Sequence, residues 1–186
     1  CKAKQEKSFL LETLNIKASP PPPTGPMSGT PLRLGIIGFG IRGEQLCRAL
    51  GFATTEWLQA MKDAAEKNPH DNRLKDFLAQ ENLNIKITGV CDIFDARAEN
   101  AVQSFSTSDH KVKRYGTHLE MLKSGNVDAV VIATPDHWHA PMAIDALNHG
   151  VHVYVEKPMT HNISETYTLR DTVRENPKLV LAVGHQ

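Results

Sequence analysis

A glycine-rich loop is the first feature of the sequence with a defined chemistry. The run Gly38-Phe39-Gly40-Ile41-Arg42-Gly43 follows the apolar segment Leu32–Ile37 and leads into Glu44-Gln45-Leu46. In this pattern the first glycine allows a tight turn, the second lets the backbone approach a pyrophosphate, and the third lets a helix pack closely on a strand. The N–H groups of that helix then face the phosphates. The loop therefore predicts a dinucleotide site to which Arg42 could add a positive charge; another ligand or a purely structural turn is the alternative.

An acidic residue follows the second predicted strand, where a dinucleotide site needs one. Asp92 comes directly after the run Ile87–Cys91. A carboxylate at this place accepts hydrogen bonds from the adenosine ribose and repels a 2′-phosphate. The pattern favours NAD over NADP as the cofactor. The nearby Arg97 keeps NADP as the alternative, and a solvated aspartate at a strand end is the structural alternative.

The spacing between these two features is unusually long. Gly38 and Asp92 are 54 positions apart, whereas about 20 residues are typical. The excess lies in residues 51–84, where apolar residues have helical spacing on both sides of the turn sequence Asn68-Pro69-His70-Asp71. These apolar residues are Trp57, Leu58, Met61, Ala65, Leu74, Phe77 and Leu78. We expect a helical hairpin inserted in the first crossover, which covers a sheet edge or contacts a partner.

A third group of polar residues follows two later apolar runs. Residues 134–139, Thr-Pro-Asp-His-Trp-His, come after Ala129–Ala133, and Glu156-Lys157-Pro158 come after Val151–Val155. The carboxyl ends of parallel strands form one edge of a sheet, where ligands bind in open α/β proteins. Pro158 restricts the backbone of Lys157 to an extended conformation. Beside the cationic nicotinamide ring of NAD, this lysine would be suited to acid–base chemistry. An exposed loop lysine is the alternative.

The glycine loop, the Ala-Thr-Pro…His block and the Glu-Lys-Pro triplet, in this order, resemble the N-terminal domain of the Gfo/Idh/MocA oxidoreductases. This family includes glucose–fructose oxidoreductase and inositol dehydrogenase, and the resemblance covers residues 32–186. It implies NAD-dependent hydride transfer at a hydroxyl-bearing carbon of a sugar or cyclitol. In the family a C-terminal substrate domain supplies a second catalytic residue and forms homo-oligomers. We therefore expect residues 1–186 to bind NAD and to be inactive alone.

The resemblance also implies roles for single residues. Lys157 would lie beside the nicotinamide and the substrate hydroxyl and aid proton movement, and Glu156 would contact the nicotinamide-side ribose. Gln186 would approach the nicotinamide. The other residues that would line the cofactor are Thr134, Pro135, Asp136, His137 and His139. Many members have asparagine where this chain has Asp136, so that contact departs from the family pattern.

The elements that must position these residues alternate along the chain. Apolar runs without strict polar alternation are typical of parallel strands buried on both faces. The predicted strands are Leu32–Ile37, Ile85–Cys91, Lys111–Arg114, Ala129–Ala133, Val151–Val155 and Leu179–Val183. The predicted helices are Glu44–Leu50, Ala96–Phe105, Leu119–Lys123, Ala140–Asn148 and, with Ser164 as its N-cap, Ser164–Glu175. This alternation predicts an α/β Rossmann fold, a doubly wound parallel sheet of order 3-2-1-4-5-6 in a three-layer α/β/α arrangement.

Length and charge exclude several classes of protein. The chain has 186 residues, with 21 Lys+Arg and 21 Asp+Glu, and this balance argues against broad nucleic-acid binding. The longest apolar run, 129–133, is far shorter than the roughly 20 residues that span a bilayer. The size fits one domain, which we place at residues 32–186. Residues 1–31 are predicted to be a tail and a proline-rich spacer. The prolines of residues 19–31 exclude a helix or a central strand from that spacer.

The three cysteines indicate no disulfide framework, because the set is odd and sparse. Cys47 and Cys91 fall in apolar runs and are expected to be buried. Cys1 resembles the lipid-modified first residue of a mature bacterial lipoprotein, which would place the protein in the cell envelope with a lipid anchor. A boundary without biological meaning and a cytoplasmic protein are the alternatives.

The histidines predict no metal site. His137-x-His139 and His149-x-x-His152 are the closest pairs among nine histidines. Neither fits a zinc pattern with cysteine partners. We therefore expect the chemistry of the site to come from the cofactor and from Lys157.

Two other function classes are open from the sequence. One is an NAD-assisted glycoside hydrolase or epimerase, in which transient oxidation of one carbon acidifies the neighbouring C–H and the cofactor is restored in each cycle. The other is a non-catalytic dinucleotide-binding module, which has no need of Glu156 and Lys157. Release of a sugar without net NADH would indicate the first of these. Loss of turnover with retained NAD binding in Lys157→Ala would argue against the second.

Overall fold

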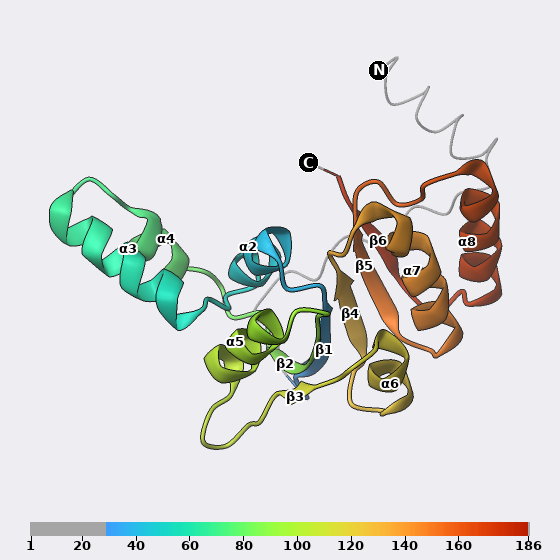
Figure 1. Ribbon diagram of the computed structural model, residues 1–186, viewed down its shortest axis with the longest axis horizontal. Coiled ribbons are helices and arrows are strands. Elements are labelled where there is room, and N and C mark those ends of the chain that lie inside the picture. The colour runs from blue at the N-terminus through green and yellow to red at the C-terminus, as the bar shows by residue number, and fades with distance from the viewer. Residues whose placement is uncertain (1–28, 186) are drawn as a thin grey trace, which may run out of the picture.

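A single parallel sheet organises the part of the chain that the computed structural model describes, residues 29–185. Its six strands lie in the order β3-β2-β1-β4-β5-β6, with helices on both faces (Figure 1). This confirms the predicted doubly wound α/β fold and its strand order. The expectations for Cys1, for residues 1–28 and for Gln186 lie outside the described residues. Within residues 29–185, no helix is long and apolar enough to cross a membrane.

The elements lie within three residues of their predicted bounds. The strands are β1 (Leu32–Ile37), β2 (Ile85–Cys91), β3 (Lys113–Arg114), β4 (Ala129–Ile132), β5 (His152–Glu156) and β6 (Leu181–Gly184). The helices are α2 (Ile41–Ala49), α3 (Thr55–Lys67), α4 (Arg73–Leu78), α5 (Asp95–Phe105), α6 (His118–Lys123), α7 (His139–Asn148) and α8 (Ile163–Glu175), and a 3-10 turn, η1 (Asp136–Trp138), precedes α7. The largest difference is at α2, whose first turn is made by the glycine loop itself.

The central strands are apolar on both faces, and each face contacts its own helical layer. Along β4, Val130 and Ile132 belong to one core, together with residues of α6, α7 and α8. The alternate residues Ala129 and Val131 belong to the other core, with residues of α2 and α5. Because successive side chains of a strand point to opposite faces, one apolar run serves both cores. The sheet thus gives rigid support to whatever lies along its carboxyl edge.

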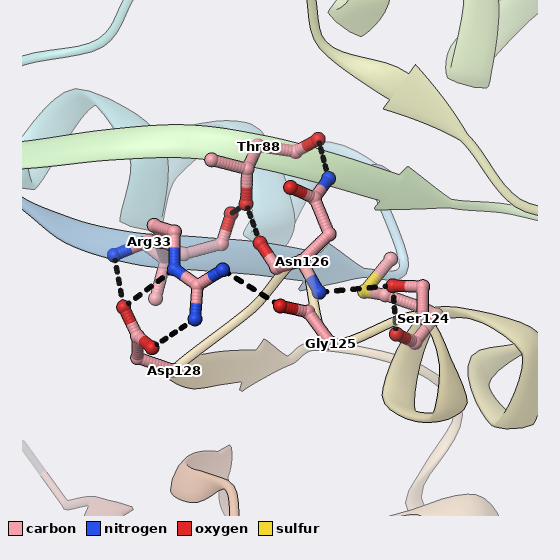
Figure 2. Close-up of polar contacts among 8 residues, drawn as sticks. Arg33, Thr88, Ser124, Gly125, Asn126 and Asp128 are labelled. Atoms are coloured by element: carbon pink, nitrogen blue, oxygen red, sulfur yellow. Dashed lines mark hydrogen bonds and ion pairs between the residues drawn. The ribbon is translucent and has the colours of Figure 1, made fainter.

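A polar network closes the amino edge of the sheet (Figure 2). Arg33 at the start of β1 donates two side-chain hydrogen bonds to Asp128, at 3.0 and 2.5 Å, and one to the Gly125 carbonyl at 2.6 Å. These bonds hold the pKa of the Asp128 carboxyl below its usual range. In β2, Thr88 donates to the Asn126 carbonyl at 2.6 Å, and the Asn126 amide returns a bond to the Thr88 carbonyl at 3.0 Å. The loop before β4 is thereby tied to both β1 and β2.

The inserted hairpin is present as helices α3 and α4, joined by the predicted turn, in which the Asp71 N–H donates to the Asn68 carbonyl at 2.9 Å. Trp57 and Phe77 pack edge to face between the two helices, with ring centroids 5.1 Å apart. The hairpin extends away from the sheet beyond α2 (Figure 1), so the expectation that it covers a sheet edge is wrong. Leu78, one of the apolar residues whose spacing predicts the second helix, is 69% exposed.

Helix α8 begins one residue earlier than predicted, and Ser164 is not its N-cap. The cap is Asn162, whose side chain accepts a hydrogen bond from the Glu165 N–H at 2.9 Å. Asparagine and serine are equally good caps, and the sequence Asn162-Ile163-Ser164 offers both. Leu169 and Thr172 form the buried face of this helix.

Candidate functional site

The glycine loop turns sharply between β1 and α2, and its outer glycines are required by close backbone contacts. Gly38 has a φ of +87°, and a Cβ at this residue would lie 2.7 Å from the carbonyl oxygen of Ala133 at the end of β4. The Gly38 N–H donates to the Cys91 carbonyl at 2.8 Å. A Cβ at Gly43 would collide with the carbonyl oxygen of Gly38. The predicted roles of these two glycines in the turn and in helix packing are thus confirmed.

The middle glycine leaves an open cradle at the start of α2. Gly40 is the N-cap and supplies no side-chain hydrogen bond. The Glu44 N–H donates to the Gly40 carbonyl at 2.9 Å, and the N–H groups before Glu44 have no partner within the helix. A Cβ at Gly40 would meet only the Arg97 guanidinium, at 3.4 Å. Free N–H groups beside an unobstructed backbone fit a pyrophosphate. Ile41, the first residue of α2, is 80% exposed, so this end of the helix is open to solvent.

Asp92 fastens the glycine loop to the end of β2. Its Oδ2 accepts the Phe39 N–H at 2.7 Å, and its Oδ1 accepts the Phe94 N–H at 2.8 Å. The residue is only 9% exposed. Each carboxylate oxygen has a further lone pair, so Asp92 can still accept the predicted ribose hydroxyls. Burial, and then the charge of Asp92, raises the pKa of the adjacent Cys91 thiol to about 11.

Replacing Asp92 with asparagine is expected to lower the free energy of unfolding by about 1–3 kcal/mol. The Phe39 and Phe94 N–H groups bind different oxygens of Asp92, and asparagine replaces one of these oxygens with an NH2 group that cannot accept. A buried N–H left without a partner has about this energetic cost. Urea denaturation followed by circular dichroism measures the change. An unchanged denaturation midpoint in Asp92→Asn would contradict the fastening role. Asp109→Asn, which alters an exposed carboxylate, is the matched control.

On the other side of the edge, His139 links the ends of β4 and β5. Its Nε2 lies 2.8 Å from the Thr134 carbonyl oxygen, and its Nδ1 lies 2.7 Å from the Pro158 carbonyl oxygen. The Lys157–Pro158 peptide bond is cis. His139 is 2% exposed, so it holds the two loops together, and its predicted contact with the cofactor stays a prediction.

Glu156 is a buried carboxylate at the carboxyl end of β5. It is 4% exposed, and its Oε1 lies 2.8 Å from both Nε and Nη2 of Arg42. Its Oε2 accepts the Lys157 N–H at 3.2 Å. Burial, and then the charge of Glu156, raises the pKa of Tyr154, whose hydroxyl lies 3.5 Å from Oε1. The Lys157 side chain is exposed.

The predicted residues of the 134–139 block differ in their exposure to solvent. Pro135, Asp136 and His137 are exposed, Thr134 is half-buried, and only His139 is enclosed. The carboxylate of Asp136 lies 3.7 Å from Nδ1 of His137 and 4.0 Å from Nε2 of His161. Among residues 29–185, no group of histidine, cysteine, aspartate and glutamate side chains could hold a metal ion.

Three residues at this edge were missed from the sequence. Tyr154 could have been found, because it lies two positions before Glu156 and so shares its face of β5. Gly184 of β6 packs against the Glu156 carboxylate, since a Cβ there would lie 2.7 Å from Oε1. His161 reaches Asp136 from the loop before α8, and no spacing in the sequence indicates that contact.

The comparisons with known proteins agree with this geometry. The family model described as "Oxidoreductase family, NAD-binding Rossmann fold" (GFO_IDH_MocA) matches residues 32–185. The chain is 33% identical over 146 residues to glycosyl hydrolase family 109 protein 2 of Shewanella sp. (strain ANA-3), a match over 76% of this chain and 26% of that relative. It is 30% identical over 99 residues to an alpha-N-acetylgalactosaminidase of Shewanella oneidensis, over 50% of this chain and 22% of that protein. The matches span about a quarter of these curated relatives.

Solved structures share the fold at lower identity. Myo-inositol 2-dehydrogenase from Lactobacillus plantarum has a TM-score of 0.61 at 22% identity, covering 83% of this chain and 36% of that one. Scyllo-inositol dehydrogenase from Lactobacillus casei, with bound NAD(H) and scyllo-inositol, has a TM-score of 0.62 at 17% identity, covering 83% and 36%. The match of the family model to nearly all of the described residues, on a glycine loop and sheet edge of the required geometry, shows that the chain belongs to the Gfo/Idh/MocA oxidoreductase family through its NAD-binding Rossmann domain.

Proposed function

We propose that this domain binds NAD across the carboxyl edge of its sheet and serves a reaction that begins with hydride removal from a hydroxyl-bearing carbon of a sugar or cyclitol. The observation that best supports the proposal is that the candidate binding residues all lie along one edge of the sheet. The open N-terminus of α2 and Asp92 lie on one side of β4, and Glu156 and Lys157 lie on the other. Because β1 and β4 flank the point where the strand order reverses, the two sides face a single crevice.

The chain's own residues divide the work at this edge. The N–H groups of α2 would bind the pyrophosphate, and Asp92 would accept the adenosine ribose hydroxyls. When bound, NAD supplies the hydride acceptor. Glu156 would accept a hydroxyl of the nicotinamide-side ribose through its Oε2, and the exposed Lys157 ammonium would hold or move the proton of the substrate hydroxyl. The width of one strand, β4, thus separates the residues that would bind the pyrophosphate and the adenosine ribose from those that would lie beside the nicotinamide.

A second candidate is NAD-assisted glycoside hydrolysis, and the names of the curated relatives favour it. The matches of 30 and 33% identity are an alpha-N-acetylgalactosaminidase and a glycosyl hydrolase family 109 protein. In that chemistry, oxidation of one ring carbon would acidify the adjacent C–H and permit loss of the group at the anomeric carbon. Glu156 and Lys157 would keep the same roles in the oxidation step.

One assay of the complete gene product separates the two reactions. The probes are myo-inositol with NAD, followed at the NADH absorbance, and p-nitrophenyl α-N-acetylgalactosaminide, followed by nitrophenol release. Stoichiometric NADH with the cyclitol would support the dehydrogenase. Nitrophenol release without net NADH would support the hydrolase. Failure of the folded protein to bind NADH at all would overturn both reactions.

A further inference from the structure

The side chain of Arg42 reaches a part of the site that its own loop does not touch. Arg42 lies in the first turn of α2, yet its Nε and Nη2 each lie 2.8 Å from Oε1 of Glu156, 114 positions away at the end of β5. The two residues are separated in the sheet by β4, which lies between β1 and β5. The ion pair therefore reaches across the carboxyl end of β4. It joins the loop that would hold the pyrophosphate to the strand that would hold the nicotinamide.

The position of the Glu156 carboxylate is restricted by its neighbours. Its Oε1 is packed against Gly184, where even a Cβ would lie 2.7 Å away, and its Oε2 accepts the Lys157 N–H. A carboxylate this buried requires a compensating charge. Among the described residues, Arg42 is the ion-pair partner of Glu156, while Lys157 takes part in no ion pair.

Without Arg42, the charge of Glu156 would have to be met by another cation. Lys157 is the adjacent residue, and its exposed ammonium would be drawn toward the carboxylate. An ammonium paired with Glu156 would no longer be directed at a substrate. A carboxylate paired with that ammonium would also be less available to the ribose that it is expected to contact.

Resting on the proposed function, we propose that Arg42 is a positioning residue for hydride transfer, which neutralises Glu156 so that this carboxylate anchors the Lys157 backbone and faces the nicotinamide-side ribose. A direct bond from Arg42 to the pyrophosphate is the competing role. The two roles differ in which part of the cofactor they affect. Positioning acts on the ribose and nicotinamide, whereas a phosphate contact acts on every ligand that carries the diphosphate.

The test compares NADH with ADP, which has the adenosine and both phosphates but neither the second ribose nor the nicotinamide. Dissociation constants of the 186-residue chain are measured by calorimetry for wild type, Arg42→Gln, Arg42→Lys, Glu156→Gln and the double variant. Arg42→Gln is expected to raise the Kd for NADH about tenfold and that for ADP less than twofold. Arg42→Lys should restore part of the NADH affinity, because it keeps the charge but not both N–H bonds. Arg48→Gln, in the same helix and paired with Glu44, is the matched control and should leave both constants unchanged.

The double variant keeps the test decisive if Arg42→Gln leaves the buried carboxylate unpaired and fails to fold. Arg42→Gln/Glu156→Gln has no buried charge to compensate, and its NADH affinity should equal that of Glu156→Gln alone. Equal losses for NADH and ADP in either Arg42 variant would overturn the positioning role in favour of a phosphate contact. Additive losses in the double variant would overturn it as well. A wild-type chain that binds ADP but not NADH would instead overturn the proposed function itself.

Discussion

Replacing Gly43 with alanine is expected to lower the free energy of unfolding by about 2 kcal/mol and to abolish NADH binding. The added Cβ collides with the carbonyl oxygen of Gly38, a backbone atom that cannot turn aside, so α2 must move off β1. Overpacking of this kind typically has a cost of about 1–3 kcal/mol, and the rigid neighbour places this case at the upper end. The gain in helix propensity from glycine to alanine, about 1 kcal/mol, opposes the loss without cancelling it. Denaturation curves and NADH titration measure the two effects.

Gly40→Ala is the matched comparison, because it should weaken NADH binding while leaving the stability of the fold nearly unchanged. Its φ of −83° suits any residue, and its Cβ would meet only the far end of the Arg97 side chain. Stability should therefore change by less than about 0.5 kcal/mol, as for most surface substitutions. NADH affinity should fall at least tenfold, because the new methyl group fills the cradle before α2. Loss of affinity in Gly43→Ala alone would mean that the phosphate does not approach Gly40.

Replacing Lys157 with methionine in the complete gene product is expected to reduce kcat about 10²–10⁴-fold while changing the Kd for NADH less than threefold. General acid–base groups contribute rate enhancements of this order, and methionine keeps the apolar stem without the ammonium. The Lys157 side chain is exposed and takes part in no ion pair among residues 29–185, so its loss should not disturb the fold. Steady-state kinetics measures the change in kcat, using whichever of the two probe substrates the wild type turns over. NADH titration measures the change in Kd.

Lys178→Met is the matched control for that experiment. Lys178 is also exposed but precedes β6, so it lies at the opposite, amino edge of the parallel sheet. It should leave kcat unchanged. Equal turnover by Lys157→Met and wild type would contradict a catalytic role for Lys157 and favour a binding module.

The fold could be predicted from the sequence because its signals are local. Leu32–Ile37 and Ile85–Cys91 match β1 and β2 residue for residue, since an apolar run buried on both faces has sharp ends at Gly38 and Asp92. The roles of Gly38 and Gly43 follow from the absence of a Cβ, which is fixed by residue type. The inserted hairpin could also be predicted, because two helical patterns around one turn are local features of the sequence.

The rest depended on tertiary contacts that leave no local pattern. The direction of Arg42 is set by a buried carboxylate 114 positions away, and a long flexible side chain gives no sign of it. The link that His139 makes between the Thr134 and Pro158 carbonyls joins two loops that are far apart in the sequence, and the residue type alone does not indicate it. Trp57 and Phe77 pack the two helices of the hairpin against each other, but helical spacing alone does not specify where the hairpin lies relative to the sheet.

Titration of the 186-residue chain with NADH tests the central claim most directly. Calorimetry should give saturable one-to-one binding that ADP displaces, because both ligands use the N-terminus of α2 and Asp92. Gly40→Ala should weaken that binding while its circular dichroism spectrum matches the wild type. A folded wild-type chain that shows no saturable NADH binding, or binding that ADP does not displace, would contradict the assignment of this sheet edge as the dinucleotide site.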